Sequence, residues 1–189
     1  MNKWLLLLIL IMSFISNVSL AEEETPIEVN EARSLIKQFG GKLKLRLKAA
    51  IEEGGLENAI EVCNVAAPDI ARNLSNQSHW QIGRTSLKLR NPNNAADPWE
   101  TEVLEQFEQR LQNGEAIKQL DYYENTSQGF RYMKAIPTQG LCLSCHGESI
   151  PASVQAKLNE FYPIDKAINY KAGQIRGAFT LIKSEKTDL

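Results

Sequence analysis

An apolar stripe with helical spacing restricts the fold of this chain more than any other feature. Between residues 29 and 50 apolar side chains recur every three or four positions, which predicts a long amphipathic helix with one buried face. These positions are Val29, Ala32, Ile36, Phe39, Leu43, Leu47 and Ala50. Gly54 and Gly55 are expected to end this helix. The stripe then resumes from Leu56 to Leu74 and places Cys63 on its buried side.

Other glycine and proline residues are expected to interrupt this helical half. Gly40 and Gly41 each cost about 1 kcal/mol relative to alanine inside a helix, so they predict a bend or a close approach of another backbone. Pro68 has no amide hydrogen and disfavours a helical residue before it. We therefore expect Pro68 to divide the second helical segment.

The second half of the chain alternates strand patterns with shorter helices. Strands are expected at 80–85, 120–124, 130–136 and 175–183, with helices at 99–112 and directly after Pro151. Helices come first, and the strands that follow show no regular βαβ alternation. This order predicts an α+β domain built on an antiparallel sheet.

Residues 1–21 have the pattern of a secretory signal peptide. Lys3 precedes an apolar run, and the small residues Ser19 and Ala21 precede the expected cut. The run is shorter than the roughly 20 residues of a spanning helix, which favours cleavage over anchoring. Residues 22–30 then form an acidic leader, and residues 31–189 form one domain in an exported, oxidising compartment.

The charge of the mature chain excludes some partners. Without Lys3, 20 basic and 23 acidic residues remain, a net charge of −3. A mildly acidic, mixed surface gives no electrostatic case for binding nucleic acid or anionic lipid.

Cys142, Cys145 and His146 form a C-x-x-C-H run, the attachment signature of c-type haem. Two thiols one helical turn apart can reach the two vinyl groups of the macrocycle, and the histidine then supplies an iron ligand. A thioredoxin-like dithiol needs a βαβ scaffold, which this pattern lacks. A structural zinc site needs four ligands, and only Cys63 and His79 lie outside the run as further Cys or His donors. A disulfide across two residues would be strained. We expect one covalent haem c.

The second axial ligand of the iron has few candidates. They are Cys63, His79 and Met133, and the position can also stay open. An unpaired thiol is a hazard in an oxidising compartment unless it is sequestered, and thiolate is an established haem ligand, so Cys63 is favoured. Such an iron is six-coordinate and closed to substrate. A haem enzyme is therefore disfavoured, also because His79 is the one spare histidine for acid–base chemistry.

The haem propionates need cationic or hydroxyl partners. Arg84, Lys88 and Arg90 lie together in one polar stretch, and Arg131 and Tyr132 precede the C-x-x-C-H run by about ten residues. These five residues are the expected propionate contacts.

Four segments, taken in order, resemble the bacterial periplasmic haem c domains with a PAS-like fold that were long catalogued as a domain of unknown function. They are residues 59–71, 82–100, 142–147 and 161–179. The resemblance implies a PAS-like antiparallel sheet flanked by helices, haem bonded to Cys142 and Cys145, and a periplasmic location. It also places Cys63 at the family's C-x-x-x-A-P cysteine. One departure is Asn169, where the family often has glycine.

Two functions are expected from these features. The first is a soluble haem-based redox or small-ligand sensor, which would pass its signal to a separate protein because the chain carries no kinase, cyclase or methyl-accepting segment. The alternative is a periplasmic monohaem electron carrier. PAS-like domains often pair through an N-terminal helix, so any homodimer is expected to form through residues 29–50.

Overall fold

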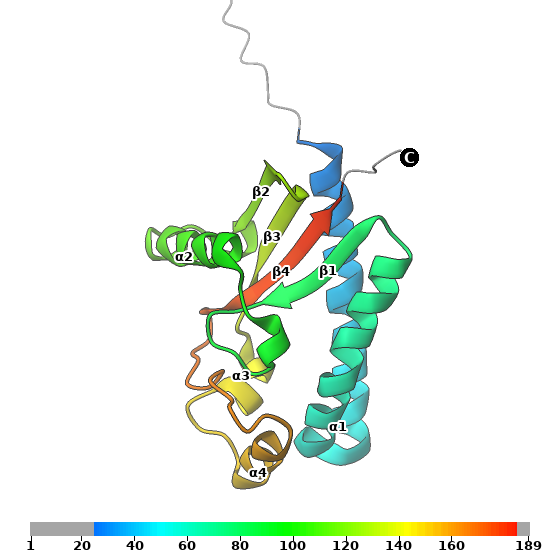
Figure 1. Ribbon diagram of the computed structural model, residues 1–189. Helices are drawn as coiled ribbons and strands as arrows, with labels where there is room; N and C mark the ends of the chain where they lie inside the picture. Colours follow the sequence, from blue (N-terminus) through cyan, green and yellow to red (C-terminus); the bar gives the residue numbers. More distant parts are fainter. Residues whose placement is uncertain (1–24, 185–189) are drawn as a thin grey trace, which may run out of the picture.

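One long helical element precedes an antiparallel sheet (Figure 1). The computed structural model describes residues 25–184, so the expected signal peptide lies outside the described residues. Within this part of the chain, no helix is long and apolar enough to cross a membrane. The elements are α1 (Ile27–Asn76), β1 (Trp80–Thr85), η1 (Pro92–Asn94), α2 (Pro98–Gln112), η2 (Ile117–Gln119), β2 (Asp121–Thr126), β3 (Gly129–Pro137), α3 (Gly140–His146), α4 (Ala152–Phe161) and β4 (Ile175–Lys183).

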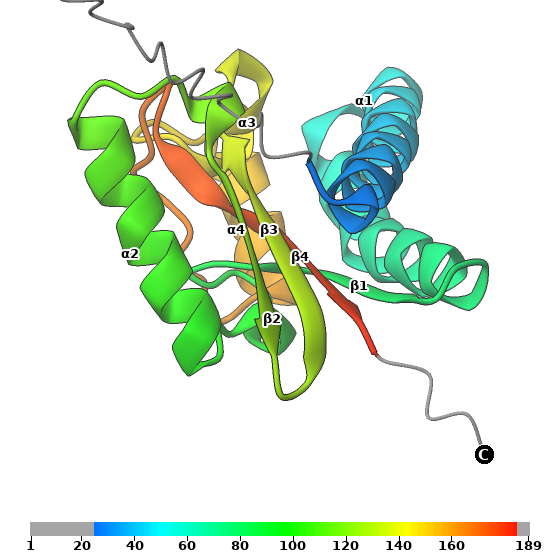
Figure 2. The ribbon, with the colours of Figure 1, turned by 90° about the horizontal axis from the view of Figure 1, so that it is seen from above.

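The long helix α1 folds back on itself at two glycines, as predicted. Gly54 and Gly55 leave helical geometry, and Gly55 has a φ of 76°, which glycine adopts without strain. The two arms run antiparallel, side by side (Figures 1 and 2). The first arm begins at Ile27, inside the expected acidic leader, because Val29 is already fully buried in the core.

The other expected interruptions of α1 are wrong. Gly40 and Gly41 lie in continuous helix, and a Cβ added at Gly40 would meet the Phe179 ring at 3.9 Å, with no backbone nearby. Pro68 also lies inside the helix. Its neighbour Ala67 is buried, so the packing of this arm outweighs the one backbone hydrogen bond that proline cannot make.

The sheet has the strand order β1-β4-β3-β2, with every neighbouring pair antiparallel. β4, the last strand within residues 25–184, therefore lies in the interior of the sheet. β1 and β4 have the predicted bounds, whereas β2 and β3 differ from them by one or two residues. The predicted α+β class, with a long N-terminal helix and an antiparallel sheet flanked by helices, is confirmed.

Each face of the sheet packs against a different helical layer (Figure 2). The α1 arms cover one face, where Phe39 and Tyr132 belong to one apolar cluster. α2 covers the other face, where Phe107 and Met133 belong to a second cluster. Tyr132 and Met133 are adjacent and both 0% exposed, because successive strand side chains point to opposite faces.

The chain between β3 and β4 forms a lobe at one end of the sheet, made of α3, α4 and the loop that follows (Figure 1). Ile60 of α1 packs with Val154 and Leu158 of α4, and Cys145 lies against this third cluster. The lobe is thereby attached to α1 near the turn between its arms.

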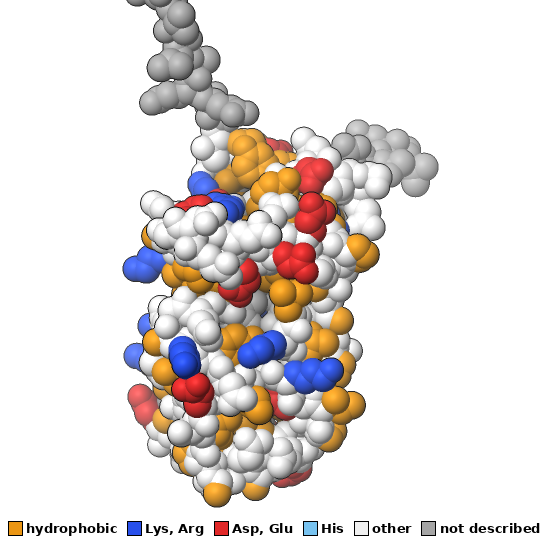
Figure 3. Space-filling view, turned by 90° about the vertical axis from the view of Figure 1, so that its left-hand side faces the viewer, with side chains coloured by type: hydrophobic (Ala, Val, Ile, Leu, Met, Phe, Trp, Pro, Cys, Tyr) orange, Lys and Arg blue, Asp and Glu red, His pale blue; other side chains and the backbone are white. Residues whose placement is uncertain are grey.

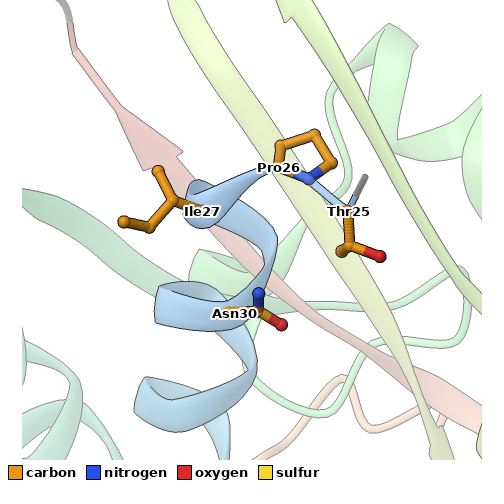
Figure 4. Close-up of a pocket in the computed structure, with 4 residues that line it drawn as sticks. All are labelled: Thr25, Pro26, Ile27 and Asn30. Carbon is orange, nitrogen blue, oxygen red and sulfur yellow. The ribbon is translucent and has the colours of Figure 1, made fainter. Parts of the chain in front are cut away.

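On the face that Figure 3 presents, several Asp and Glu side chains gather in the upper part, and several Lys and Arg side chains lie in a band below them. A shallow pocket lies at the start of α1 and is lined by Thr25, Pro26, Ile27 and Asn30 (Figure 4). It contains no ionisable side chain and lies at the opposite end of the molecule from α3 and α4 (Figure 1).

Candidate functional site

The C-x-x-C-H run forms the short helix α3. Cys142 and Cys145 are three residues apart, so both thiols lie on one face of this helix. Both are half-buried and free, and burial raises the pKa of the Cys145 thiol. The helix ends before Gly147, where an added Cβ would lie 2.6 Å from the Leu143 carbonyl oxygen. Glycine is therefore required by the helix's own backbone.

His146, the last residue of α3, has a defined tautomer. Its Nδ1 lies 2.7 Å from the carbonyl oxygen of Ala167, which can only accept a hydrogen bond, so Nδ1 carries the proton. Burial lowers the pKa of His146 well below its ordinary value, and the charges of Arg176 and Arg90 add to this effect. The ring is neutral at pH 7, and Nε2 keeps its lone pair. Nε2 faces Nη1 of Arg90 at 3.3 Å, a contact that a metal on this nitrogen would replace.

The segment 162–170 closes over the end of α3. The backbone amides of Asn169 and Tyr170 donate to the carbonyl oxygens of Gly147 and His146, at 3.1 and 2.9 Å. Asn169 has a φ of 62°, a conformation in which Asn is tolerated and glycine is free. This turn therefore accounts for the departure noted from the family pattern at Asn169.

Two arginines in this region lack a carboxylate partner. Within residues 25–184, the side chain of Arg84 makes no hydrogen bond or ion pair, and its guanidinium lies 5.6 Å from the centre of the Phe39 ring. Arg176 of β4 donates to the Ser86 hydroxyl at 3.1 Å. Burial lowers the pKa of both guanidinium groups. Both arginines are partly buried, and partly desolvated positive charge without a counter-ion is costly, so both residues are suited to an anionic ligand.

Lys88 and Arg90 complete a cationic group beside His146. Nζ of Lys88 lies 4.8 Å from the centre of the Tyr170 ring, and this ring lies edge-on to the His146 imidazole. Arg90 pairs with Asp165 at 2.9 Å and donates to the Cys145 carbonyl at 2.5 Å. The structure thus brings the expected basic stretch of residues 84–90 to the C-x-x-C-H helix.

Cys63 lies on the second arm of α1, on the side that meets the lobe. The next residue, Asn64, accepts a hydrogen bond from the Tyr162 hydroxyl at 3.1 Å. Burial raises the pKa of the Cys63 thiol, and the positive charges of Arg84 and Arg90 oppose that effect. Cys63 therefore faces the same cationic group that surrounds His146.

The other two candidates for the second axial ligand lie elsewhere. Met133 is fully buried in the cluster under α2. His79 follows the end of α1, and the 13 residues from Cys63 to Asn76 span about 20 Å at the rise of a helix. Of the three side chains considered, the structure brings Cys63 to the site.

Arg131 and Tyr132, two of the expected propionate contacts, are engaged away from the site. Arg131 pairs with Asp97 at 2.8 Å, and the Tyr132 hydroxyl donates to Asp121 at 2.6 Å. The six residues from Arg131 to Pro137 extend over about 20 Å at the rise of a strand. Arg131 and Tyr132 are close to the C-x-x-C-H run in sequence but not in space, because the strand between them is fully extended.

Four residues of the site were not singled out from the sequence. Arg176, Tyr162, Asp165 and Tyr170 all lie in the segment 161–179, which was quoted for the family resemblance without roles for its members. One signal was available: Arg176 is a charged residue at the second position of a mostly apolar strand pattern, next to the buried Ile175.

The assembled residues fit a c-type haem. Two thiols stand one helical turn apart, and the residue after them has a neutral imidazole whose Nε2 keeps its lone pair. A third thiol faces them from α1. Haem propionates would supply the anionic partner that the side chains of Arg84 and Arg176 lack. The donor set and the uncompensated cations therefore match both ends of the same cofactor.

The fold and the site define a class: an α+β domain with a helical hairpin on one sheet face and a lobe between β3 and β4 that presents a C-x-x-C-H helix to partly buried arginines. The chain belongs to the Tll0287-like family, whose model matches residues 11–184. This assignment confirms, at the level of the family, the resemblance inferred from the sequence.

A solved structure is similar to this chain, that of the cyanobacterial heme-protein Tll0287. The two share 24% identity with a TM-score of 0.67, over 87% of this chain and 99% of that chain. At this identity the likeness shows the fold. A search among curated proteins found no match.

Proposed function

We propose that this chain is a periplasmic c-type haem protein that acts as a haem-based redox or small-ligand sensor. Cys142 and Cys145 would form the thioether bonds, and His146 and Cys63 would be the axial ligands. One observation carries the haem assignment: the neutral imidazole of His146, whose Nε2 keeps its lone pair, lies near the partly buried Arg84 and Arg176, which have no carboxylate partner within residues 25–184. The heme-protein Tll0287, which has the same fold, supports it. When bound, haem supplies an iron whose charge changes by one unit on reduction.

The residues of the chain have separable roles in this proposal. His146 is oriented by the Ala167 carbonyl, which keeps the proton on Nδ1 and the lone pair on Nε2. Arg84 and Arg176, together with Lys88, neutralise the propionates. The cluster of Ile60, Val154 and Leu158 excludes water from the side of the site that adjoins α1.

The arrangement of the two axial donors supports a sensor. Cys63 belongs to α1, whereas His146 belongs to α3, so the two donors come from separately packed elements. α1 covers one whole face of the sheet and contacts β1 and α4. Loss of the bond at Cys63 would therefore release a constraint between α1 and the lobe, and a protein partner could read that change on the surface of α1.

An electron carrier is the second candidate, and one observation favours it. Leu141, next to Cys142, is 42% exposed, so the tethered edge of a haem would lie close to the surface from which electrons transfer. We propose no catalytic role, because His79 lies away from the site and no other histidine remains for acid–base chemistry.

The holoprotein tests the haem assignment directly. After expression with haem-attachment machinery, the mass should rise by one haem, and the haem should stay with the denatured polypeptide. A Cys142→Ala, Cys145→Ala double variant should lose this retention. A wild-type chain that releases its haem on denaturation would contradict covalent attachment.

Electron paramagnetic resonance tests the axial ligand. Cys63→Ala should remove the low-spin thiolate signature, whereas the control Val65→Ala, at a 57% exposed position on the same arm, should keep it. A Cys63→Ala spectrum like wild type would show that another group binds the iron. A sensor should change coordination on reduction or on adding CO or NO. If the iron stays six-coordinate in both redox states and with both gases, the electron-carrier function is favoured over the sensor function.

A further inference from the structure

A buried ion pair lies directly beside the C-x-x-C-H helix. The side chains of Asp165 and Arg90 are 5% and 11% exposed. Nε and Nη2 of Arg90 lie 3.0 and 2.9 Å from the same Asp165 oxygen, Oδ2. The other oxygen, Oδ1, accepts from the backbone amide of Ala167 at 2.8 Å. Asp165 therefore joins Arg90 to the backbone of Ala167.

Asp165, Arg90 and Ala167 form a closed ring of contacts, and His146 is hydrogen-bonded to this ring. The Ala167 carbonyl accepts from His146 Nδ1 at 2.7 Å and from Arg90 Nη2 at 3.4 Å. Arg90 also donates to the Cys145 carbonyl at 2.5 Å, which ties it to α3. Both backbone groups of Ala167 are thus held, its amide by Asp165 and its carbonyl by His146 and Arg90.

Arg176 competes for the same imidazole nitrogen. Its Nε lies 3.2 Å from His146 Nδ1, and Nε of arginine can only donate. If the Ala167 carbonyl moved away, the most favourable hydrogen bond left for Nδ1 would be one that it accepts from Nε of Arg176. The proton would then reside on Nε2 and would block that nitrogen as a metal ligand. Arg90 Nη1, which can only donate, faces Nε2 at 3.3 Å and favours the same tautomer as the Ala167 carbonyl, so these two groups together hold the proton on Nδ1 against Arg176.

Stability alone does not account for a buried pair of this kind. Desolvating two charges is costly, and well-packed apolar residues often replace such pairs without loss of stability. The better-attested use of buried polar contacts is to fix one geometry among several. At a metal-binding histidine, the partner of the second nitrogen fixes the tautomer and ring orientation and raises the basicity of the ligand.

We propose that Asp165 is the positioning residue for His146, acting through Arg90 and the Ala167 backbone. It holds the carbonyl against Nδ1, outcompetes Arg176, and so sets both the ligation by His146 and the reduction potential of the bound haem. This inference rests on the proposed haem-binding function and adds residues that determine how the iron behaves.

The test compares Asp165→Asn and Arg90→Lys with Glu148→Gln in the holoprotein. Arg90→Lys keeps the charge but loses the planar fork that spans Asp165 and Cys145. Glu148→Gln removes the same charge as Asp165→Asn, two residues from His146, at a side chain that is 60% exposed. Reduction potential and electron paramagnetic resonance report on ligand basicity and imidazole orientation.

Asp165→Asn and Arg90→Lys should both shift the potential upward, because a less basic imidazole stabilises the ferric state less. Both should also change the resonance pattern and increase the high-spin fraction. Glu148→Gln should resemble wild type. A wild-type potential and spectrum in Arg90→Lys, with an Asp165→Asn shift no larger than that of Glu148→Gln, would mean that the pair acts by charge alone and would overturn the proposal.

A second measurement separates this inference from the haem assignment. In the full chain without haem, where Nε2 carries no iron, nitrogen-15 chemical shifts of the His146 ring report its tautomer. Wild type should show the proton on Nδ1, and Asp165→Asn should move it toward Nε2. Adding Arg176→Met to Asp165→Asn should restore Nδ1–H, because the competing donor is gone. If Asp165→Asn keeps the wild-type tautomer, the positioning role is refuted even if the protein binds haem. If the wild-type chain does not bind haem, only the proposed function is refuted.

Discussion

Replacing Leu158 with alanine is expected to loosen the attachment of the lobe to α1. Leu158 is 0% exposed and packs with Ile60 across the α1–α4 contact. The substitution removes three carbon atoms, worth about 0.8 kcal/mol each, or about 2.4 kcal/mol of transfer free energy. The cavity left behind brings the total to about 3–4 kcal/mol. For a domain of this size that corresponds to a fall in Tm of about 6–16 °C.

Thermal and urea unfolding measure this loss, and the resonance spectrum of the holoprotein measures its effect on the site. Cys63 and His146 lie on the two elements that this cluster joins, so part of the thiolate signature should disappear with the packing. The control Leu45→Ala, at a 71% exposed position, should change the free energy of unfolding by no more than about 0.5 kcal/mol. Equal effects of the two variants would refute the view that this cluster attaches the lobe.

Asp121 and Gly147 carry the remaining predictions. Burial raises the pKa of the Asp121 carboxyl, but hydrogen bonds from Tyr132 and Arg33 outweigh it and hold that pKa below its usual range. The stabilisation is therefore present above about pH 4 and is lost as the pH falls through the lower folded pKa. Asp121→Asn should lower the free energy of unfolding by about 2 kcal/mol at pH 7, and thermal melts should then show a smaller loss of stability between pH 7 and pH 3 than in wild type. A loss of stability as large as in wild type would mean that another carboxylate causes the acid dependence. Gly147→Ala should cost about 1–3 kcal/mol and lower the haem-to-protein ratio, because its Cβ would meet the Leu143 carbonyl, whereas Gly140→Ala, with nothing within 4 Å, should do neither. Indistinguishable haem ratios in these two variants would contradict the role given to Gly147.

Local patterns predicted the parts of the structure that local interactions determine. The alternation of side chains located β1 and β4, and the pair Gly54 and Gly55 located the turn of α1. The C-x-x-C-H spacing is itself local, since one helical turn brings Cys142 and Cys145 to one face. Cys63 was favoured for a chemical reason, the hazard of an unpaired thiol, and the structure brings it to the site.

The residues that prediction missed depend on contacts across the sheet. Arg131 and Tyr132 were favoured because they precede the haem motif, but an extended strand carries them away from it. Arg176 lies thirty residues after His146 and reaches it only because β4 crosses the end of the lobe. Pro68 was given its intrinsic cost as a helix breaker, and burial of the surrounding arm overrides that cost. A single sequence contains no direct signal for such contacts.

The interior position of β4 has a consequence for the order in which the molecule can form. Of the strands within residues 25–184, β4 is synthesised after the other three, yet it pairs with both β1 and β3. Until it inserts, β1 has no neighbour in the sheet, and both apolar faces are incomplete. The cysteines of α3, by contrast, precede β4 by some thirty residues and need only one turn of helix to stand together. A cofactor could thus be attached to a chain whose sheet is still open, and the closing strand, which brings Arg176, would enclose it afterwards.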